Sequence, residues 1–130
     1  MKNSKIGKVI KPANTNPWPH EERVAMILAR AGYRVEFIPK SGVKTADILL
    51  NRTEFEIKSP ISPKIKAVER NLARASKQSP NIIFDSSRMK NVRDELILKQ
   101  LIVRLKAGKG IKKIIFINKR DKIVDVNELI

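Results

Sequence analysis

The chain has 130 residues, enough for one domain with a modest core. Its 28 Lys and Arg residues against 13 Asp and Glu residues give a net charge of +15, which indicates an anionic partner: nucleic acid, an acidic protein or a membrane surface. The absence of cysteine excludes disulfides and thiolate chemistry, and the single histidine, His20, excludes a histidine-based metal cluster or a catalytic histidine pair. No apolar run approaches the roughly 20 residues of a membrane span, and no signal peptide is visible. We therefore expect a cytoplasmic protein with no membrane partner.

Apolar spacing and turn residues predict a basic, loosely structured arm over residues 1–19, followed by one folded domain over 20–130. The elements expected in chain order are a helix over 20–31, strands over 34–38, 46–50 and 53–58, a helix over 64–78, a strand over 81–85, a helix over 92–106, and strands over 113–117 and 122–126. This order predicts a single-domain α/β fold, in which an α-β-β-β-α-β core with a mixed sheet is followed by a helix and a β-hairpin.

The strands 46–50 and 53–58 are joined by two residues, so a hairpin register follows directly. In it Ile48 faces Phe55, and Asp47 faces Glu56. Side chains alternate between faces, so Asp47, Glu54, Glu56 and Lys58 share the face opposite the apolar residues. Two carboxylates paired across a hairpin lie about 5 Å apart and repel each other, so they indicate a bound cation or a shared proton.

Mg²⁺, or Mn²⁺ in its place, suits such a pair, because Mg²⁺ takes few carboxylate oxygens and keeps several waters. Lys58, two residues beyond Glu56, is placed to orient the attacking water or to stabilise charge on a phosphate. The alternative is an ordinary amphipathic hairpin with a solvated polar face, and Glu54 is expected to lie at its rim.

The pattern Asp47-x8-Glu56-x-Lys58, on the second and third strands after a leading helix, resembles the PD-(D/E)XK nuclease superfamily. The resemblance implies a restriction-endonuclease-like fold and a further glutamate from the first helix. Glu21 has the matching position, with Glu22 as the alternative, and Asp47, Glu56 and Glu21 would then hold the metal. A helix N-terminal acid that complements the dipole explains Glu21 equally well. Gln78 matches a polar residue that touches the site in this superfamily, although a helix C-terminal contact also explains it.

Three further segments widen the resemblance to about residues 20–126. They are Glu56-Ile57-Lys58-Ser59-Pro60, Asn71-Leu72-x-x-Ala75-x-Lys77-Gln78-Ser79 and Asn81-Ile82-Ile83-Phe84-Asp85. Together they resemble the C-terminal tRNase domains of contact-dependent growth inhibition toxins. The resemblance implies a ribonuclease acting on tRNA, an acidic immunity protein as partner, and delivery into a target cell as part of a larger toxin. Some toxins of this system have a metal-free fold, in which case His20 would be the expected base.

A basic stripe at helical spacing follows the predicted site. It consists of Lys66, Arg70, Arg74 and Lys77, and Arg88 adds to it from the loop after 81–85. Such a stripe is usually a solvated helix face, but beside an acidic site we expect it to hold phosphates. Asp85 either reaches the substrate or caps the turn that follows it. Six aromatic residues are too few for a base-stacking platform, which favours a folded RNA or a DNA duplex recognised by charge and shape.

Three functions compete. A metal-dependent ribonuclease of tRNA is preferred to a DNA endonuclease of the resolvase or repair type. A nucleic-acid-binding protein without activity comes third, because a protein that has lost its catalytic activity would not need to keep two carboxylates facing each other.

Overall fold

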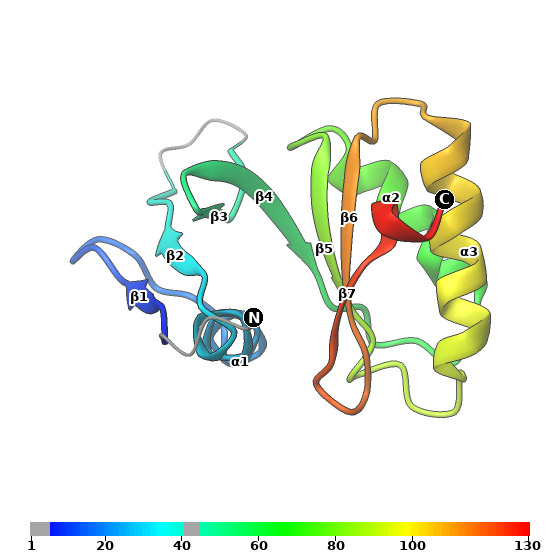
Figure 1. The fold of residues 1–130 in the computed structure, drawn as a ribbon, viewed down its shortest axis with the longest axis horizontal. Helices are drawn as coiled ribbons and strands as arrows, with labels where there is room; N and C mark the ends of the chain where they lie inside the picture. The colour runs from blue at the N-terminus through cyan, green and yellow to red at the C-terminus, as the bar shows by residue number, and fades with distance from the viewer. Residues whose placement is uncertain (1–5, 41–44) are drawn as a thin grey trace. The chain divides into compact units, whose positions relative to one another are not determined.

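The computed structural model describes residues 6–40 and 45–130. Figure 1 labels its elements. In chain order they are β1 (Lys8–Ile10), α1 (Pro19–Arg30), β2 (Arg34–Phe37), β3 (Ile48–Leu50), β4 (Thr53–Lys58), α2 (Lys66–Ala75), β5 (Asn81–Asp85), α3 (Asp94–Ala107), β6 (Lys113–Ile117), β7 (Ile123–Asp125) and the 3-10 helix η1 (Val126–Leu129). The strands form one seven-stranded mixed sheet in sequence order. The chain divides into two compact units, Met1–Phe55 and Glu56–Ile130, and the boundary falls inside β4.

The first unit consists of α1 and the β1–β4 ladder. β1 runs parallel to β2, while β3 runs antiparallel to both β2 and the first half of β4. Helix α1 begins at Pro19, which suits a first helical position because it has no N–H to leave unpaired. It buries Val24 and Leu28, and Gly32 follows its end at φ 103°, a conformation that glycine adopts without strain.

Strand β1 corrects the expected loose arm. Its N-terminal neighbour Gly7 donates its N–H to Ala29 O at 2.7 Å, and a Cβ atom at Gly7 would lie 1.8 Å from Tyr33 O. A residue without a side chain is thus needed for β1 to reach β2. Short strands whose pairing depends on distant backbone contacts leave little periodic signal, so the pattern did not predict this one. Residues 1–5 of the expected arm lie outside the described part.

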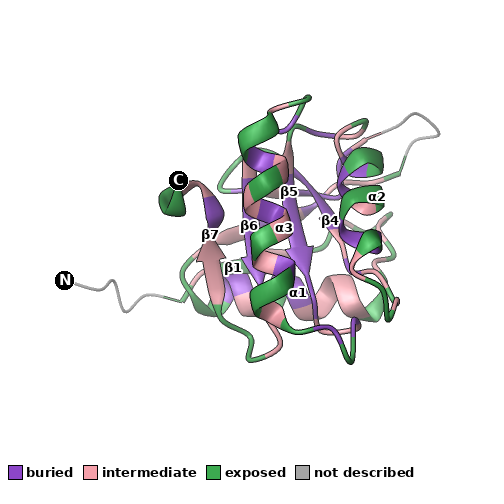
Figure 2. Ribbon diagram, turned by 90° about the vertical axis from the view of Figure 1, so that its right-hand side faces the viewer, coloured by how far each residue is buried: buried purple, intermediate pink, exposed green. Residues whose placement is uncertain are grey.

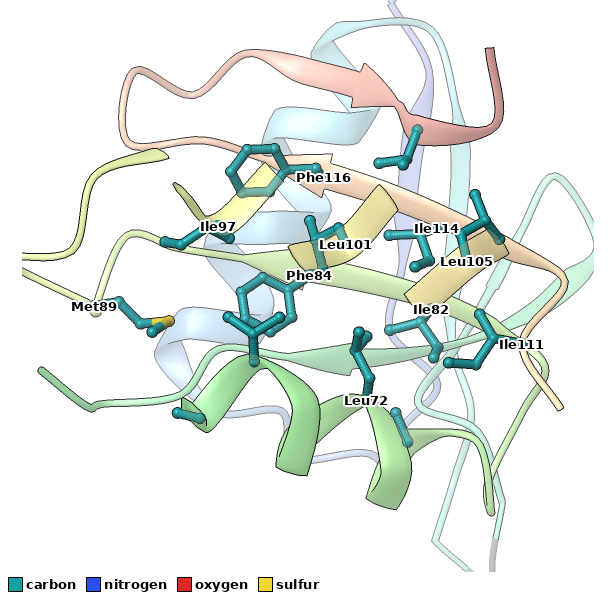
Figure 3. Packing of buried hydrophobic residues seen from close by; sticks show 14 of the residues in the cluster. Leu72, Ile82, Phe84, Met89, Ile97, Leu101, Leu105, Ile111, Ile114 and Phe116 are labelled. Atoms are coloured by element: carbon teal, nitrogen blue, oxygen red, sulfur yellow. The ribbon is translucent and has the colours of Figure 1, made fainter. Parts of the chain in front are cut away.

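The second unit is a β4–β5–β6 parallel ladder with β7 antiparallel at its edge. Helices α2 and α3 connect the parallel strands, and both pack on one face of this ladder. The core between them includes Leu72 of α2, Phe84 of β5, Leu101 of α3 and Phe116 of β6, as Figure 3 shows. Each fully buried side chain of this size stabilises the fold by about 1.5–3 kcal/mol. In Figure 2, α3 alternates between buried and exposed residues as an amphipathic helix should.

The expected mixed α/β architecture is confirmed, and three of the predicted strands, 53–58, 81–85 and 113–117, have the observed bounds. Helix α2 is shorter than expected: it ends at Ala75, and the next residues form turns before Pro80. Helix α3 begins two residues later than predicted. The terminal 3-10 helix, η1, was not predicted. None of the helices formed by the described residues is long and apolar enough to cross a membrane.

Candidate active site

The second half of β4 holds a carboxylate and an ammonium group side by side. Glu56 and Lys58 pair in register with Ile82 and Phe84 of β5. Register partners on neighbouring strands point to the same side of a sheet. Ile82 and Phe84 belong to the core under α2 and α3, so Glu56 and Lys58 lie on that same face. Lys58 Nζ is 3.6 Å from Glu56 Oε2.

Burial distinguishes Glu56 from an ordinary surface acid. The Glu56 side chain is only 9% exposed, whereas the Lys58 side chain is 24% exposed. A carboxylate removed from water is retained only where its charge is compensated. A solvated polar face is therefore the wrong interpretation for Glu56, while Glu54 is exposed as expected. A carboxylate here can hold a water or a cation, and the ammonium group can neutralise charge on a phosphate.

Asp47 lies in the first unit, directly before β3. It is 7% exposed, and Lys40 Nζ lies 2.8 Å from its Oδ1 atom. Its backbone is held on both sides, because Asp47 N donates to Phe55 O and Asp47 O accepts from Ile38 N. The predicted pairing of Ile48 with Phe55 is confirmed, as are the two pairs closer to the turn. The next pair, Asp47 with Glu56, crosses the unit boundary and stays a prediction.

Glu21 is in the first turn of α1, and its Oε1 accepts the Trp18 N–H at 3.0 Å. This contact satisfies a backbone donor at the helix start, as the capping interpretation of Glu21 requires. A catalytic role for Glu21 stays a prediction, as does one for His20, the residue before it. Of the five residues predicted to be catalytic, Glu21 and Asp47 belong to the first unit, and Glu56, Lys58 and Gln78 to the second.

Gln78 follows the end of α2 instead of lying within it. Its N–H donates to Ala75 O at 2.8 Å, so the backbone supplies the helix-end contact. The side-chain oxygen of Gln78 is buried and has no hydrogen-bond partner among the described residues. A buried acceptor without a donor is costly, and a water or a ligand group can supply the missing hydrogen bond. No described residue donates to the Gln78 side-chain oxygen, so this oxygen is available to a ligand. The role expected from the sequence, contact with the active site, stays a prediction.

Ser59, which directly follows Lys58, joins the ends of β4 and β5, and the sequence pattern did not single it out. Its hydroxyl donates to Asp85 Oδ2 at 2.8 Å. Asp85 also accepts from the Ser87 N–H at 3.1 Å, so the turn-capping interpretation of Asp85 is confirmed. Arg88 donates to Ser59 O from Nε at 3.0 Å and from Nη2 at 2.5 Å. These contacts hold the chain rigidly at the carboxyl ends of both strands.

The predicted basic stripe is on the surface of the second unit. Lys66, Arg70 and Arg74 are exposed on α2, and Lys77 is exposed just beyond it. None of these four makes an ion pair with a described residue. Arg88 differs from them, because its guanidinium group donates two hydrogen bonds to Ser59 O.

No group of three or more His, Cys, Asp or Glu side chains within residues 6–40 and 45–130 is arranged to hold a metal ion. Mg²⁺ needs only one or two protein carboxylates when phosphates and waters complete its shell. Glu56 in one unit and Asp47 in the other are each buried beside a lysine ammonium, so each is a suitable single ligand. The combination of Glu21, Asp47 and Glu56 stays a prediction, since its members belong to both units.

A second polar cluster, also unpredicted, lies at the start of α3. Asp94 accepts the Ser86 hydroxyl at 2.6 Å and the Lys119 N–H at 3.0 Å, and Lys119 Nζ is 3.2 Å away. Burial raises the pKa of the Asp94 carboxyl, but these hydrogen bonds and the Lys119 charge outweigh burial and lower the pKa below its ordinary value of 3.8. In the sequence, Asp94 could be recognised only as an acidic residue near the start of a predicted helix, which did not indicate this cluster.

Comparison with known proteins gives two matches. A sequence model of the contact-dependent growth inhibition CdiA C-terminal domain matches residues 44–123. A solved chain of the CdiA-CT/CdiI toxin and immunity complex from Burkholderia pseudomallei superposes with a TM-score of 0.69 at 19% identity, over 90% of this chain and 97% of that one. At this identity the likeness shows a shared fold. No curated protein sequence matches.

Proposed function

This chain belongs to the contact-dependent growth inhibition CdiA C-terminal domain family, and we propose that it is a toxin domain that hydrolyses phosphodiester bonds in RNA. Transfer RNA is the preferred substrate, ahead of DNA. The observation that carries the proposal is the pair formed by the buried Glu56 carboxylate and the Lys58 ammonium group, 3.6 Å apart on β4. A net charge of +15 supports a polyanionic substrate.

The two side chains divide the chemistry. The Glu56 carboxylate would orient the attacking water and accept a proton from it. The Lys58 ammonium group, more exposed than Glu56, would approach the phosphate and stabilise the negative charge that develops on its oxygens. Gln78, whose side-chain oxygen has no donor in the described fold, would accept a hydrogen bond from the water or from a ribose hydroxyl.

A divalent ion, Mg²⁺ or Mn²⁺, completes this proposal. Glu56 and Asp47 are the residues proposed to hold it, with Glu21 as a third candidate. When bound, such an ion lowers the pKa of a coordinated water and neutralises phosphate charge. Lys40 and Lys58 beside the two principal carboxylates support the idea that these oxygens accept a cation.

We also propose a PD-(D/E)XK-like arrangement for this site. Asp47 directly precedes β3, and Glu56 and Lys58 are on β4, after the leading helix α1, so the order of motif and elements agrees with that superfamily. The confirmed hairpin register supports the spacing of the motif. An acidic immunity protein is the proposed protein partner, supported by the immunity protein in the complex of the structural neighbour.

The function is tested by incubating the purified chain with total tRNA or plasmid DNA, in Mg²⁺ or in EDTA. We expect cleavage of tRNA that requires the metal. Glu56→Gln and Lys58→Met should each lower the rate by about 100-fold or more, the usual contribution of an acid–base or charge-stabilising group. Asp47→Asn should lower it comparably.

Matched controls come from neighbouring positions. Glu54→Gln changes an exposed acid on the same strand, and Lys64→Met an exposed lysine beyond its end. Both should keep the wild-type rate, and thermal unfolding should confirm that all variants fold. Equal cleavage in EDTA would contradict the metal site and make His20 the residue to test, and cleavage of DNA alone would favour the resolvase or repair class. Binding of tRNA without cleavage would leave a non-enzymatic binding protein.

A further inference from the structure

The second unit has a hollow of about 430 Å³ beyond the carboxyl ends of β4 and β5. One wall is the loop after β4, with Ile61, Ser62 and Pro63. The other is the loop after β5, with Arg88, Lys90 and Asn91. The carboxyl ends of parallel strands are the usual place for ligands in α/β sheets, because the connecting loops diverge there. The volume is within the range of about 300–1,000 Å³ that pockets for small ligands occupy.

Both walls are stiff before any ligand arrives. In the first wall Pro63 restricts the backbone, and the Ser62 hydroxyl accepts the Lys64 N–H at 3.1 Å. In the second wall Met89 and Val92 are buried and anchor the loop, and Figure 3 shows Met89 beside the core residues. Preformed walls lower the entropy lost on binding, so even a small ligand group can be held there.

One wall of the hollow is apolar and the other is cationic, which matches a ligand that has both a flat apolar group and an anionic group. Ile61 is 74% exposed, so its apolar side chain is accessible to a ligand in the hollow. Arg88 has five N–H donors and uses two of them on Ser59 O, which leaves three for a ligand. Lys90 is exposed and makes no ion pair with a described residue. A flat apolar group would cover Ile61, and an anion would accept from Arg88 and Lys90.

We propose that this hollow binds one nucleotide of the RNA strand, next to the phosphate that is cut. Its base lies against Ile61 and Pro63, and its phosphate is held by Arg88 and Lys90. One lining residue of the hollow, Arg88, donates to the carbonyl of Ser59, the residue after Lys58, and so connects the hollow to the strand end that carries the proposed catalytic pair. This inference rests on the proposed nuclease function and adds a position that sets where the strand is cut.

The test is a titration of the full chain carrying Glu56→Gln with the four nucleoside 5′-monophosphates, inorganic phosphate and uncharged nucleosides, followed by amide NMR shifts. We expect the monophosphates to shift the amides of Ile61, Ser62, Lys90 and Asn91, and to bind more tightly than phosphate or nucleoside alone. Ile61→Ser should weaken the monophosphates about tenfold without affecting phosphate. Lys90→Gln should weaken both.

Ile61 and Lys90 are exposed, so neither variant is expected to disturb the fold. Val103→Ser and Lys99→Gln make matched changes at exposed positions of α3 and should leave every affinity unchanged. Absent shifts in the hollow, or equal affinities in all variants, would overturn the inference. So would an effect of Ile61→Ser and Lys90→Gln confined to binding of an acidic protein.

Failure of the inference and failure of the proposed function give different results. If the wild-type chain cuts neither RNA nor DNA but binds monophosphates as described, the nucleotide pocket stands and the nuclease proposal fails. If the chain cuts tRNA and the hollow does not respond to monophosphates, the nuclease proposal stands and the pocket fails.

Discussion

Two acids of the second unit, Asp85 and Asp94, accept hydrogen bonds from serine hydroxyls and serve the fold. Asp85 accepts from Ser59 and Ser87, and its carboxylate thereby closes a turn. Asp94 accepts from Ser86 in the same manner. Glu56, the proposed catalytic residue, is buried, and Lys58 Nζ lies 3.6 Å from its Oε2 atom. The positive charge of Lys58 compensates the burial of the Glu56 carboxylate, whereas serine hydroxyls and backbone N–H groups fix the positions of Asp85 and Asp94.

Asp94 carries a pH prediction. Its pKa is lowered in the folded chain, so its contribution to stability is fully present above 3.8 and is lost as the pH falls through the lower folded value. Asp94→Asn should therefore destabilise the chain at pH 7, on the order of 1 kcal/mol, because hydrogen bonds to a charged acceptor are lost. The difference between variant and wild type should shrink below pH 3.8.

The measurement is urea unfolding at pH 7 and at several lower values. Glu95→Gln, an exposed neighbour on the same helix turn, is the control and should change little. A stability difference for Asp94→Asn that stays constant with pH would contradict the assigned role of its charge.

Among the secondary-structure elements, α2 has one apolar face that packs into the core and one cationic face that is exposed. One face contributes Val68 and Leu72 to the core. The other presents Lys66, Arg70 and Arg74 at four-residue intervals, so the three cations share one exposed side. A helix with one apolar and one cationic side packs against the sheet and still offers a row of charges to a phosphate backbone.

We predict that the double variant Arg70→Gln and Arg74→Gln binds tRNA more weakly and with less dependence on salt. Each lost phosphate contact should reduce the slope of log affinity against log salt by about 0.9. The cleavage rate at saturating tRNA should stay near the wild-type value, because these side chains position substrate and do not react. Fluorescence anisotropy with labelled tRNA measures the slope. The double variant Lys99→Gln and Lys106→Gln on α3 removes the same charge and should not change it.

For the whole molecule, the excess of 28 cationic over 13 acidic side chains is the dominant electrostatic fact. Charge of one sign attracts a polyanion from a distance and is screened beyond about 8 Å at physiological salt. We therefore expect the affinity of the Glu56→Gln variant for tRNA to fall about 10³–10⁵-fold between 50 and 200 mM salt if six to ten phosphates are contacted. An affinity for tRNA that does not change with salt in the same anisotropy assay would contradict recognition of phosphates by the cationic side chains.

Local pattern was sufficient for most of the fold. The strands 53–58, 81–85 and 113–117 were predictable because their apolar runs are bounded by turn residues, and the hairpin register followed from its two-residue loop. That Glu56 and Lys58 share one face of a strand was predictable from their spacing, and their role in catalysis stays a prediction. These features depend on neighbours along the chain, so no tertiary information was needed.

Other features depended on contacts between distant residues. β1 reaches β2 because Gly7 fits against the backbone of Tyr33, and the hollow lies between two loops that the hydrogen bonds from Arg88 to Ser59 hold together. The alternation of side chains along a strand shows which residues share a face, but it does not show whether that face is covered by other elements. It therefore could not decide whether Glu56 faces water or the core. The packing of α2 and α3 on one face decided it, because burial is a property of the assembled layers and not of the local sequence.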